Sequence, residues 1–377
     1  MLEKKWLEDE IEFVYQKVME NLPLFEEKVP PAVSKNYYYE PVENEDWTDG
    51  FWIGMLHLCQ EYKPNDEIAN VIKKQLDVFQ NRLDQEIVLN HHDIGFLYSL
   101  SAVADYRLNR TFSSREMALQ AADVLMRRYE PNSKVIQAWG SLENKKEQGR
   151  MIIDCNMNLP LLFFATEETG NQEYRQAAEN HVERAVKYLI RDDNSTYHTY
   201  HMDVETGEAL QGSTAQGNSD NSCWARGQAW GIYGFANMFN YIDDIKFVEA
   251  AVKLADYFID HLPNNHIAYW DLEFSEGSEE ERDTSSSAIM VCGLLELIKQ
   301  LPISDKRRSV YQAKSIEIIK SLAENYTTKK HPNYNGILVE GVYTKPGNYG
   351  VSESTIWGDY FYLEALIRMY QSWYSYW

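Results

Sequence analysis

The sequence predicts an all-α protein whose helices form an (α/α)6 barrel, and two observations lead to this fold class. Twelve helix-length segments follow one another along the 377 residues, and amphipathic segments alternate with almost wholly apolar ones. A helix with one polar face lies at a surface, whereas a helix without one is buried on every side. No segment of comparable length shows the alternation of a half-buried strand. Six buried helices inside six amphipathic ones therefore suggest a closed ring of helical hairpins.

The amphipathic segments place apolar residues three and four positions apart and charges on the other face. They are expected at 7–22, 66–83, 114–129, 173–190, 246–262 and 307–326. The apolar segments are expected at 47–62, 91–106, 151–168, 223–241, 285–299 and 355–370. Pro160 should kink or restart the third apolar helix, because it lacks an N–H donor. An open α-solenoid is the alternative, but its repeats would have nearly constant length, and these segments begin at irregular intervals.

Composition narrows the classes of partner and compartment. With 36 basic and 58 acidic side chains the net charge is −22, which argues against binding to nucleic acids or anionic membranes. No segment has the run of about 18 apolar residues that spans a membrane, and the charged N-terminal segment lacks the apolar core of a signal peptide. The four cysteines form no CxxC pair, so we expect reduced thiols and a cytoplasmic protein. Because no linker divides the chain, residues 1–377 are predicted to form a single domain.

Polar and aromatic residues gather in the first turns of the apolar segments. If alternate helices run the same way round the ring, these turns meet at one end of the barrel, where helix N-termini present unpaired N–H groups. The residues are Trp47, Asp49, His91, His92, Asp93, Asp154, Trp224, Arg226, Gln228, Ser285, Ser286, Trp357 and Asp359. A polar, aromatic-rimmed end of an apolar barrel is typical of a small-molecule site. The aromatic content of 13% favours a sugar as the ligand.

Asp93 and Asp154 are the candidate catalytic pair. Each lies at the mouth of an apolar helix, in "HHDIG" and "IIDC", where burial would raise the pKa of a carboxyl group toward neutrality. Two carboxyl groups in one site resemble a glycosidase pair, in which one transfers the proton and the other positions or stabilises. An acidic residue in a first turn can also be a helix cap or dipole partner, which is enough to explain Asp49 and Asp359.

Histidines raise the question of a metal. A site could in principle be built around Asp93 from His91, His92, His198 and His201. Neither HExxH nor a Cys/His set with ligand spacing is present, so no metal and no cofactor are predicted. We expect His198 to hydrogen-bond a polar ligand and His201 to pack.

A turn-rich loop carries Gln216 and Arg226 into the fourth apolar helix, beside Trp224 and Trp230. A guanidinium is suited to gripping a carboxylate in a fork of hydrogen bonds. An ion pair between Arg226 and a neighbouring structural aspartate would explain the same residue equally well.

Taken in order, these segments resemble the unsaturated glucuronyl hydrolases of glycoside hydrolase family 88. The likeness runs through "NEDWTDGFWIGML", "HHDIGFLYSL", "VIQAWG", "GRMIIDCNMNLPLL", "YHTY", "QGNSDNSCWARGQAWGIYGFA" and "TIWGDYFYLEAL". That family has an (α/α)6 barrel, as the helix pattern also indicates. The resemblance implies that Asp154 is the catalytic acid/base and Asp93 the second essential aspartate. It also implies substrate contacts, from the sugar- or carboxylate-binding His198, Gln216, Arg226 and Trp230 and from the aromatic walls Trp47 and Trp139.

The implied substrate is an oligosaccharide left by a polysaccharide lyase, ending in a uronic acid with a C4=C5 double bond. Asp154 would protonate C4, water would add at C5, and the resulting hemiketal would open to release a keto acid. One departure affects specificity: Ala215 stands where relatives commonly carry a basic residue before the glutamine of "QGN", and the segment 343–354 is individual to this chain. Chondroitin, hyaluronan, heparin and gellan fragments, sulfated or plain, therefore all remain candidate sources.

Three other functions are compatible with the same residues. An unsaturated rhamnogalacturonyl hydrolase would use the same chemistry on pectin fragments, although "HHDIG" and "WARGQAW" favour the glucuronyl substrate. A sugar epimerase on the same barrel would rely on histidine pairs for proton transfer. A non-catalytic carbohydrate-binding protein would leave two buried carboxylates as an unexplained cost.

Overall fold

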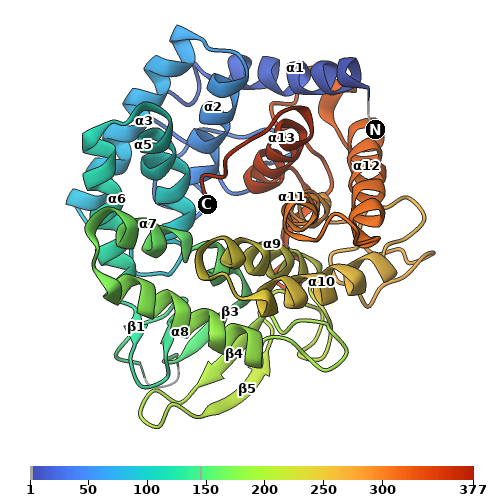
Figure 1. Ribbon diagram of the computed structural model, residues 1–377. Coiled ribbons are helices and arrows are strands. Elements are labelled where there is room, and N and C mark those ends of the chain that lie inside the picture. Colours follow the sequence, from blue (N-terminus) through green and yellow to red (C-terminus); the bar gives the residue numbers. More distant parts are fainter. Residues whose placement is uncertain (1–2, 145–146) are drawn as a thin grey trace.

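Two layers of helices form a closed ring in the computed structural model, which describes residues 3–144 and 147–377 (Figure 1). The outer layer consists of α1 (Lys4–Asn21), α3 (Asp66–Asp84), α6 (Phe112–Met126), α8 (Gln172–Tyr188), α10 (Ile245–Asp260) and α12 (Arg307–Asn325). The inner layer consists of α2 (Gly50–Tyr62), α4 (Ile94–Tyr98) with η1 (Ser99–Val103) and α5 (Ala104–Asn109), η2 (Ile153–Met157) with α7 (Pro160–Thr169), α9 (Ala225–Ile242), α11 (Thr284–Gln300) and α13 (Ile356–Tyr370). The predicted (α/α)6 barrel is confirmed.

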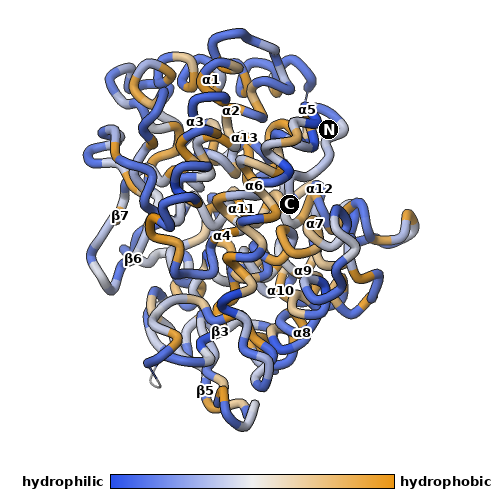
Figure 2. The backbone as a smooth tube through the Cα atoms, turned by 90° about the vertical axis from the view of Figure 1, so that its left-hand side faces the viewer, coloured by the Kyte–Doolittle hydropathy of each residue, from blue (hydrophilic) through white to orange (hydrophobic). Residues whose placement is uncertain are grey.

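The ring closes where the last inner helix meets the first. Helix α13 packs against α11 on one side and against α2 and α1 on the other. Its residues from Ile356 to Ile367 are all buried, as the absence of a polar face predicted. The buried apolar side chains form one cluster that extends from Leu7 to Trp377, and Figure 2 shows the hydrophobic stretches running through the helical body. None of the described helices is long and apolar enough to cross a membrane.

Two inner segments are less regular than a single helix. The predicted helix over 91–106 begins only at Ile94 and widens into a π-helical turn at Ser99–Val103. The Ser101 hydroxyl donates to the Leu97 carbonyl at 2.7 Å, and such a bond competes with the regular backbone ladder and bends helices. The restart predicted at Pro160 is confirmed, since a 3-10 turn ends before it and α7 begins with it. The first helical position tolerates proline because its N–H would have no partner there.

Small antiparallel sheets in the connections between helices were not predicted. The two-stranded sheets pair β1 (Tyr129–Glu130) with β2 (Val135–Ile136) and β6 (Gly341–Thr344) with β7 (Tyr349–Glu353). In the three-stranded sheet the central strand β4 (Thr199–Met202) lies between β3 (Arg150–Ile152) and β5 (Ala209–Ser213). A short 3-10 turn, η3 (Thr328–Lys330), follows α12. Strands of two to five residues are too short to give a readable hydrophobic period. Three of them, β3, β5 and β7, precede inner helical segments and so help to position the helix mouths. The β6–β7 hairpin projects from one side of the helical body (left in Figure 2).

Close contact between neighbouring inner helices requires glycine at Gly50. A Cβ atom placed there would lie 2.1 Å from the carbonyl oxygen of Phe96. We predict that Gly50→Ala lowers the free energy of unfolding by about 1–3 kcal/mol, because the helix backbones must separate. Urea denaturation measures this loss. The matched control is Ser309→Ala on the exposed face of α12, which should stay within about 0.5 kcal/mol of the wild type. Equal midpoints for the two variants would contradict the packing argument.

Candidate active site

Asp93 and Asp154 lie at the mouths of two neighbouring inner segments. Asp93 is the residue before α4, and Asp154 lies in the first turn of η2. The two mouths are joined because the Phe96 N–H donates to the Asn158 side-chain oxygen at 2.8 Å. Gly95 permits this contact, since a Cβ atom there would lie 2.4 Å from the Asn158 Cα. Two acids that are far apart in the sequence thereby become neighbours, with an oxygen of one within 4.8 Å of an oxygen of the other.

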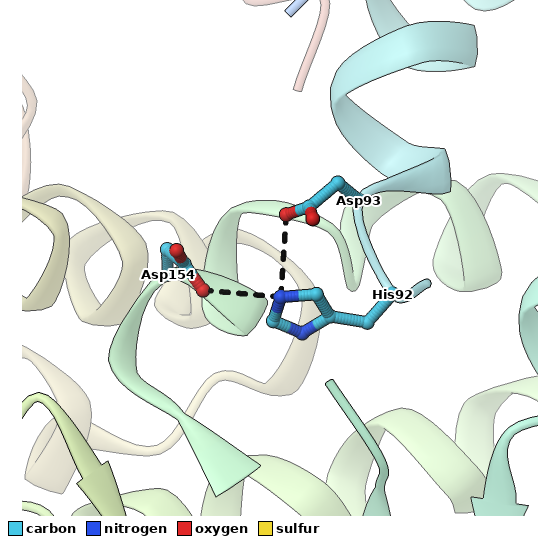
Figure 3. Close-up of side chains that lie close together, drawn as sticks. All are labelled: His92, Asp93 and Asp154. Atoms are coloured by element: carbon cyan, nitrogen blue, oxygen red, sulfur yellow. Dashed lines mark ion pairs between the residues drawn. The ribbon is translucent and has the colours of Figure 1, made fainter. Parts of the chain in front are cut away.

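His92 lies between the two carboxyl groups (Figure 3). Its Nε2 atom is 3.2 Å from an oxygen of Asp93 and 3.3 Å from an oxygen of Asp154. The His92 side chain is only 1% exposed, whereas those of Asp93 and Asp154 keep 13% and 15% exposure. Solvent, and therefore a ligand, can reach the two acids but not the imidazole behind them.

The two aspartates have opposite electrostatic environments. Burial raises the pKa of Asp154 to about 7, and the charge of Asp93 adds to this effect, while His92 and Arg226 oppose it. Burial also disfavours the charged form of Asp93, but the neighbouring His92 and His91 outweigh it and lower the pKa of Asp93 below its usual range. One carboxyl group can therefore carry a proton near neutral pH while the other stays ionised.

His92 itself is stabilised as a cation. Burial opposes its protonation, but the charges of Asp93 and Asp154 outweigh this and hold the pKa of His92 well above its usual value. The result is an imidazolium shared by two acids, of which only one needs to be ionised to balance its charge.

His198 contributes a hydrogen-bond donor to the same region. Its Nδ1 atom accepts the backbone N–H groups of Ala215 at 3.0 Å and Gln216 at 3.2 Å. Burial lowers the pKa of His198 to about 3, and the positive charges of Arg226, His92 and Arg150 act in the same direction. The ring is therefore neutral and carries its proton on Nε2, which is buried without a hydrogen-bond partner in the described part of the chain. The contact with a polar ligand that the sequence predicted would occupy this donor.

Arg226 and Gln216 hold the β6–β7 hairpin. Arg226 donates to the carbonyl oxygens of Val342 and Tyr343, the latter at 2.7 Å, and Gln216 donates to the same Tyr343 oxygen at 2.8 Å. The guanidinium also pairs with Asp283 at 3.4 Å and is 1% exposed. The alternative interpretation of Arg226, an ion pair with a structural aspartate, thus describes its contacts. Direct contact of Arg226 or Gln216 with a substrate stays a prediction.

The three predicted tryptophans occupy different depths. Trp47 is half-buried and donates from its indole nitrogen to the Tyr343 hydroxyl at 2.9 Å. Trp139 is also half-buried; the Arg150 guanidinium lies 5.0 Å from its ring centre. Trp230 is 1% exposed and packs against Phe96 and Phe361 in the barrel interior. Trp47 and Trp139 can form aromatic walls, whereas Trp230 lies deeper than the residues that contact solvent.

Two other acids of the first turns are structural, as expected, although neither caps a helix with its carboxylate. Asp49 forms a buried ion pair with Arg82 at 3.1 Å. Asp359 accepts the backbone N–H groups of Ile337 and Leu338 and so holds the segment before β6. His201 makes a hydrogen bond with the Ser213 hydroxyl on the neighbouring strand, in agreement with the packing role predicted for it.

Comparison with known proteins agrees with this arrangement. The profile of Glycosyl Hydrolase Family 88 matches residues 26–372. The chain belongs to glycoside hydrolase family 88. It is 42% identical over 377 residues to the unsaturated chondroitin disaccharide hydrolase of Streptococcus pneumoniae (strain ATCC BAA-255 / R6), covering 100% of this chain and 95% of that protein. It is also 42% identical over 357 residues to the unsaturated glucuronyl hydrolase of Bacillus sp. (strain GL1), covering 95% of each.

A solved structure extends the likeness to the fold. The crystal structure of unsaturated glucuronyl hydrolase from Streptococcus agalactiae superposes with a TM-score of 0.95 at 42% identity, and the match covers 100% of this chain and 95% of that chain. The chain is therefore a glycoside hydrolase of family 88, and the barrel described above is the scaffold of that family.

The position of His92 is the main feature of this family 88 site that the sequence did not predict. Sequence reasoning weighed His92 only as a possible metal ligand or epimerase residue. The signal available was its place in "HHDIG", directly before a candidate catalytic aspartate. Asp283 and Tyr343, the partners of Arg226 and Trp47, were also missed, because they come from distant segments.

The three groups could also be compared with a metal site, since one nitrogen of His92 and one oxygen of each aspartate lie within 4.8 Å of one another. A histidine that binds a metal must be neutral, whereas its surroundings favour the protonated form of His92. We therefore interpret the cluster as a proton-transfer group. The expectation that the enzyme needs no metal and no cofactor stays a prediction.

The raised pKa of Asp154 predicts how activity depends on pH. If Asp154 must donate a proton, kcat/KM should fall by about tenfold per unit as the pH rises through about 7, where Asp154 loses its proton. Because the pKa of Asp93 is lowered, Asp93 should stay ionised at pH values where an ordinary aspartate would take up a proton. Activity should therefore persist in mildly acidic solution. The pH profile of kcat/KM measures both the fall at high pH, assigned to Asp154, and the fall at low pH, assigned to Asp93. Activity that stays constant to pH 9 would exclude Asp154 as the acid.

Chelation tests the interpretation of the cluster as metal-free. Exhaustive dialysis against EDTA should leave kcat/KM unchanged, because the imidazolium of His92 takes the place that a cation would occupy. A loss of activity that added Zn²⁺ or Mn²⁺ restores would contradict this interpretation.

Proposed function

We propose that this enzyme removes the 4,5-unsaturated uronic acid from the non-reducing end of lyase-generated oligosaccharides by hydrating the C4=C5 double bond. The observation that carries the proposal is the pair of unlike aspartates at one barrel mouth, with the pKa of Asp154 raised to about 7 and that of Asp93 lowered. Hydration of a double bond needs one group that first gives and then takes a proton, beside a second that stays charged.

The first step suits a carboxyl group that is protonated near neutral pH. The double bond is an enol ether conjugated with the uronate carboxylate, so C4 is its basic carbon. Transfer of the Asp154 proton to C4 breaks the π bond and leaves positive charge shared by C5 and the ring oxygen. The ionised carboxylate of Asp93, within 4.8 Å of Asp154, stabilises a cation in its vicinity.

The second step returns the proton. Asp154, now a carboxylate, accepts a proton from a water molecule while the water oxygen bonds to C5. The product is a hemiketal at C5, which opens by breaking the bond between C5 and the ring oxygen, so that C5 becomes a ketone and C1 a hemiacetal. Collapse of that hemiacetal breaks the glycosidic bond at C1, which releases the remaining sugar as an alcohol and leaves a keto acid with an aldehyde at C1. One water is consumed for each bond cleaved, and Asp154 ends in its starting state.

The substrate groups would meet donors and rings already in place. On the family resemblance we assign the Nε2–H of His198 to a hydroxyl or carboxylate of the unsaturated sugar; this donor has no hydrogen-bond partner within the described residues, so a sugar that enters beside it would satisfy it. Trp47 and Trp139, both half-buried, would pack on the faces of the sugar rings. The roles of Gln216, Arg226 and Trp230 as further contacts are proposed on the family resemblance.

The source polysaccharide is proposed to be a glycosaminoglycan of the chondroitin type. A relative named for unsaturated chondroitin disaccharide and one named as a glucuronyl hydrolase are equally similar, at 42% identity. Ala215, whose exposed side chain carries no charge, offers no cation for a sulfate. We further propose a cytoplasmic location, supported by four buried cysteines that are free thiols, and one domain over 1–377, supported by the continuous apolar cluster.

One assay tests the function directly. The purified protein is mixed with unsaturated disaccharides from chondroitin, hyaluronan, heparin and gellan lyases, in sulfated and plain forms, and the ultraviolet absorbance of the conjugated double bond is followed. We expect the band to disappear fastest with the unsulfated chondroitin disaccharide. The control is Asp154→Asn, which keeps the size of the side chain but cannot give a proton and should lose about 10²- to 10⁴-fold in kcat.

Other outcomes would replace the proposal. Loss of the band only with pectin-derived fragments would indicate a rhamnogalacturonyl hydrolase. Turnover of saturated sugars with no loss of the band would favour an epimerase, and binding without either reaction would favour a carbohydrate-binding protein. Wild-type turnover by folded Asp154→Asn would remove Asp154 from the mechanism.

A further inference from the structure

His92 contacts both acids of the proposed reaction, yet the reaction as described above does not use it. Its side chain is 1% exposed, so a sugar that reaches Asp93 and Asp154 does not reach the imidazole. Figure 3 shows the ring reaching in between the two carboxyl groups from the segment before α4. Any influence of His92 on the reaction must therefore pass through the two aspartates.

We propose that His92 is a positioning residue that divides the roles of the two aspartates, by holding Asp93 as the anion and leaving Asp154 to carry the proton. The inference rests on the proposed function for its chemistry. Without the ring, two carboxyl groups within 4.8 Å of each other would repel as anions and share one proton between them, and the remaining anion would lose the cation that contacts both of them.

The contacts around Asp93 and Asp154 determine which of the two is the anion and which carries the proton. Asp93 has two imidazoles beside it, since His91 also lies 3.5 Å from its second oxygen and adds to the lowering of its pKa, whereas Asp154 has only His92 in the part of the chain that the structure describes. Its backbone N–H also donates to the His91 ring at 3.1 Å, which fixes the local turn. The Asp154 oxygen facing His92 has no aligned hydrogen bond within the described residues. The anion is therefore better stabilised on Asp93, and the proton remains on Asp154.

The ring is held from behind rather than by the substrate. The backbone N–H of His92 donates to the Ala138 carbonyl at 2.8 Å and fixes the residue that carries the ring. The buried Cys155 thiol is next to the imidazole, which lowers the pKa of that thiol, but burial outweighs this effect. Its Nδ1 atom is buried without a hydrogen-bond partner in the described structure. The position of the Nε2 atom is thus set by packing, and it does not depend on a bound ligand.

Other charged or titratable groups surround His92, on the segments before α4, after α6 and before β4, and on η2, α8 and α9. They are His91, Arg128, Cys155, His181, His198 and Arg226. Burial lowers the pKa of His181 to about 3, with a small contribution from His92, and His198 has the same low pKa. Burial raises the pKa of the Cys155 thiol. His181 and His198 therefore stay neutral from pH 5 to 8, the Cys155 thiol stays protonated, and the two guanidinium groups stay charged. None of these five groups adds a limb to a pH profile in that range.

His92→Gln tests the proposal, because glutamine keeps an N–H donor in the region of Nε2 but has no charge. His92 lowers the pKa of both aspartates, so its replacement should raise both. We expect both limbs of the kcat/KM profile to move to higher pH by about one to three units, with a loss in kcat at pH 6 that exceeds any change in KM. The control is His266→Gln on the protein surface, where His266 lies 3.8 Å from Glu317; its profile should match the wild type.

The result that would overturn the proposal is a folded His92→Gln enzyme whose two limbs coincide with those of the wild type. A structural role alone would lower activity equally at every pH and leave the limbs in place. Circular dichroism of the variant shows whether it has folded.

A second measurement needs neither the variant nor a substrate. In wild-type protein labelled with ¹⁵N-histidine, one of the nine imidazoles should remain protonated above pH 7.5, and its signal should move in Asp154→Asn. If all nine rings are neutral at that pH, His92 is not the cation and the proposal fails. Because this titration does not involve catalysis, it distinguishes a failure here from a failure of the proposed function, which the absorbance assay reports.

Discussion

The exclusion of water from the six inner helices is the constraint on which the rest of the structure depends. Helices buried on every side cannot present polar groups to their neighbours, because an unpaired buried charge costs several kcal/mol. Charged residues of these helices therefore lie toward the ends, and those buried at the mouths are paired, as Asp49 is with Arg82 and Arg226 with Asp283. Glycines such as Gly50 and Gly95 allow the backbones to approach closely at these ends. A polar site at one mouth follows from the requirement for a dry barrel wall.

Within that mouth, environment makes two identical side chains unlike. Asp93 and Asp154 have the same carboxyl group and nearly the same exposure, 13% and 15%, yet the pKa of one is lowered and that of the other raised. The difference comes from the cation between them and from the unequal number of histidines around each. Acid–base enzymes commonly obtain an acid and a stable anion from one residue type in this way. In this chain the difference in pKa is a property of the cluster, and neither aspartate has it alone.

The loops and short strands between the helices complete the site, and the inner helices support them. Strand β3 leads directly into the turn that carries Asp154, and the β6–β7 hairpin is fastened to the inner helices through Arg226 and Gln216. Tyr343 of that hairpin in turn holds the indole of Trp47. Loops of this kind commonly vary while the scaffold beneath them persists, and we therefore expect specificity to depend on the segments around Ala215 and 343–354. The residues that would meet the second sugar therefore belong to connections, and those that would perform the chemistry belong to helix mouths.

Hydrophobic periodicity is a local property, and for this reason the sequence by itself determined the number, order and layer of the helices and the ring that they form. It also indicated Asp93 and Asp154 as a pair, because an acid at the mouth of an apolar helix is a local anomaly. The strands, the π-helical turn at Ser99–Val103 and the engagement of Arg226 by Asp283 could not be read in this way. The same holds for His92, whose two contacts join segments sixty residues apart. Such features depend on distances between parts of the chain that only tertiary packing brings together, and the charge state of each acid depends on those distances.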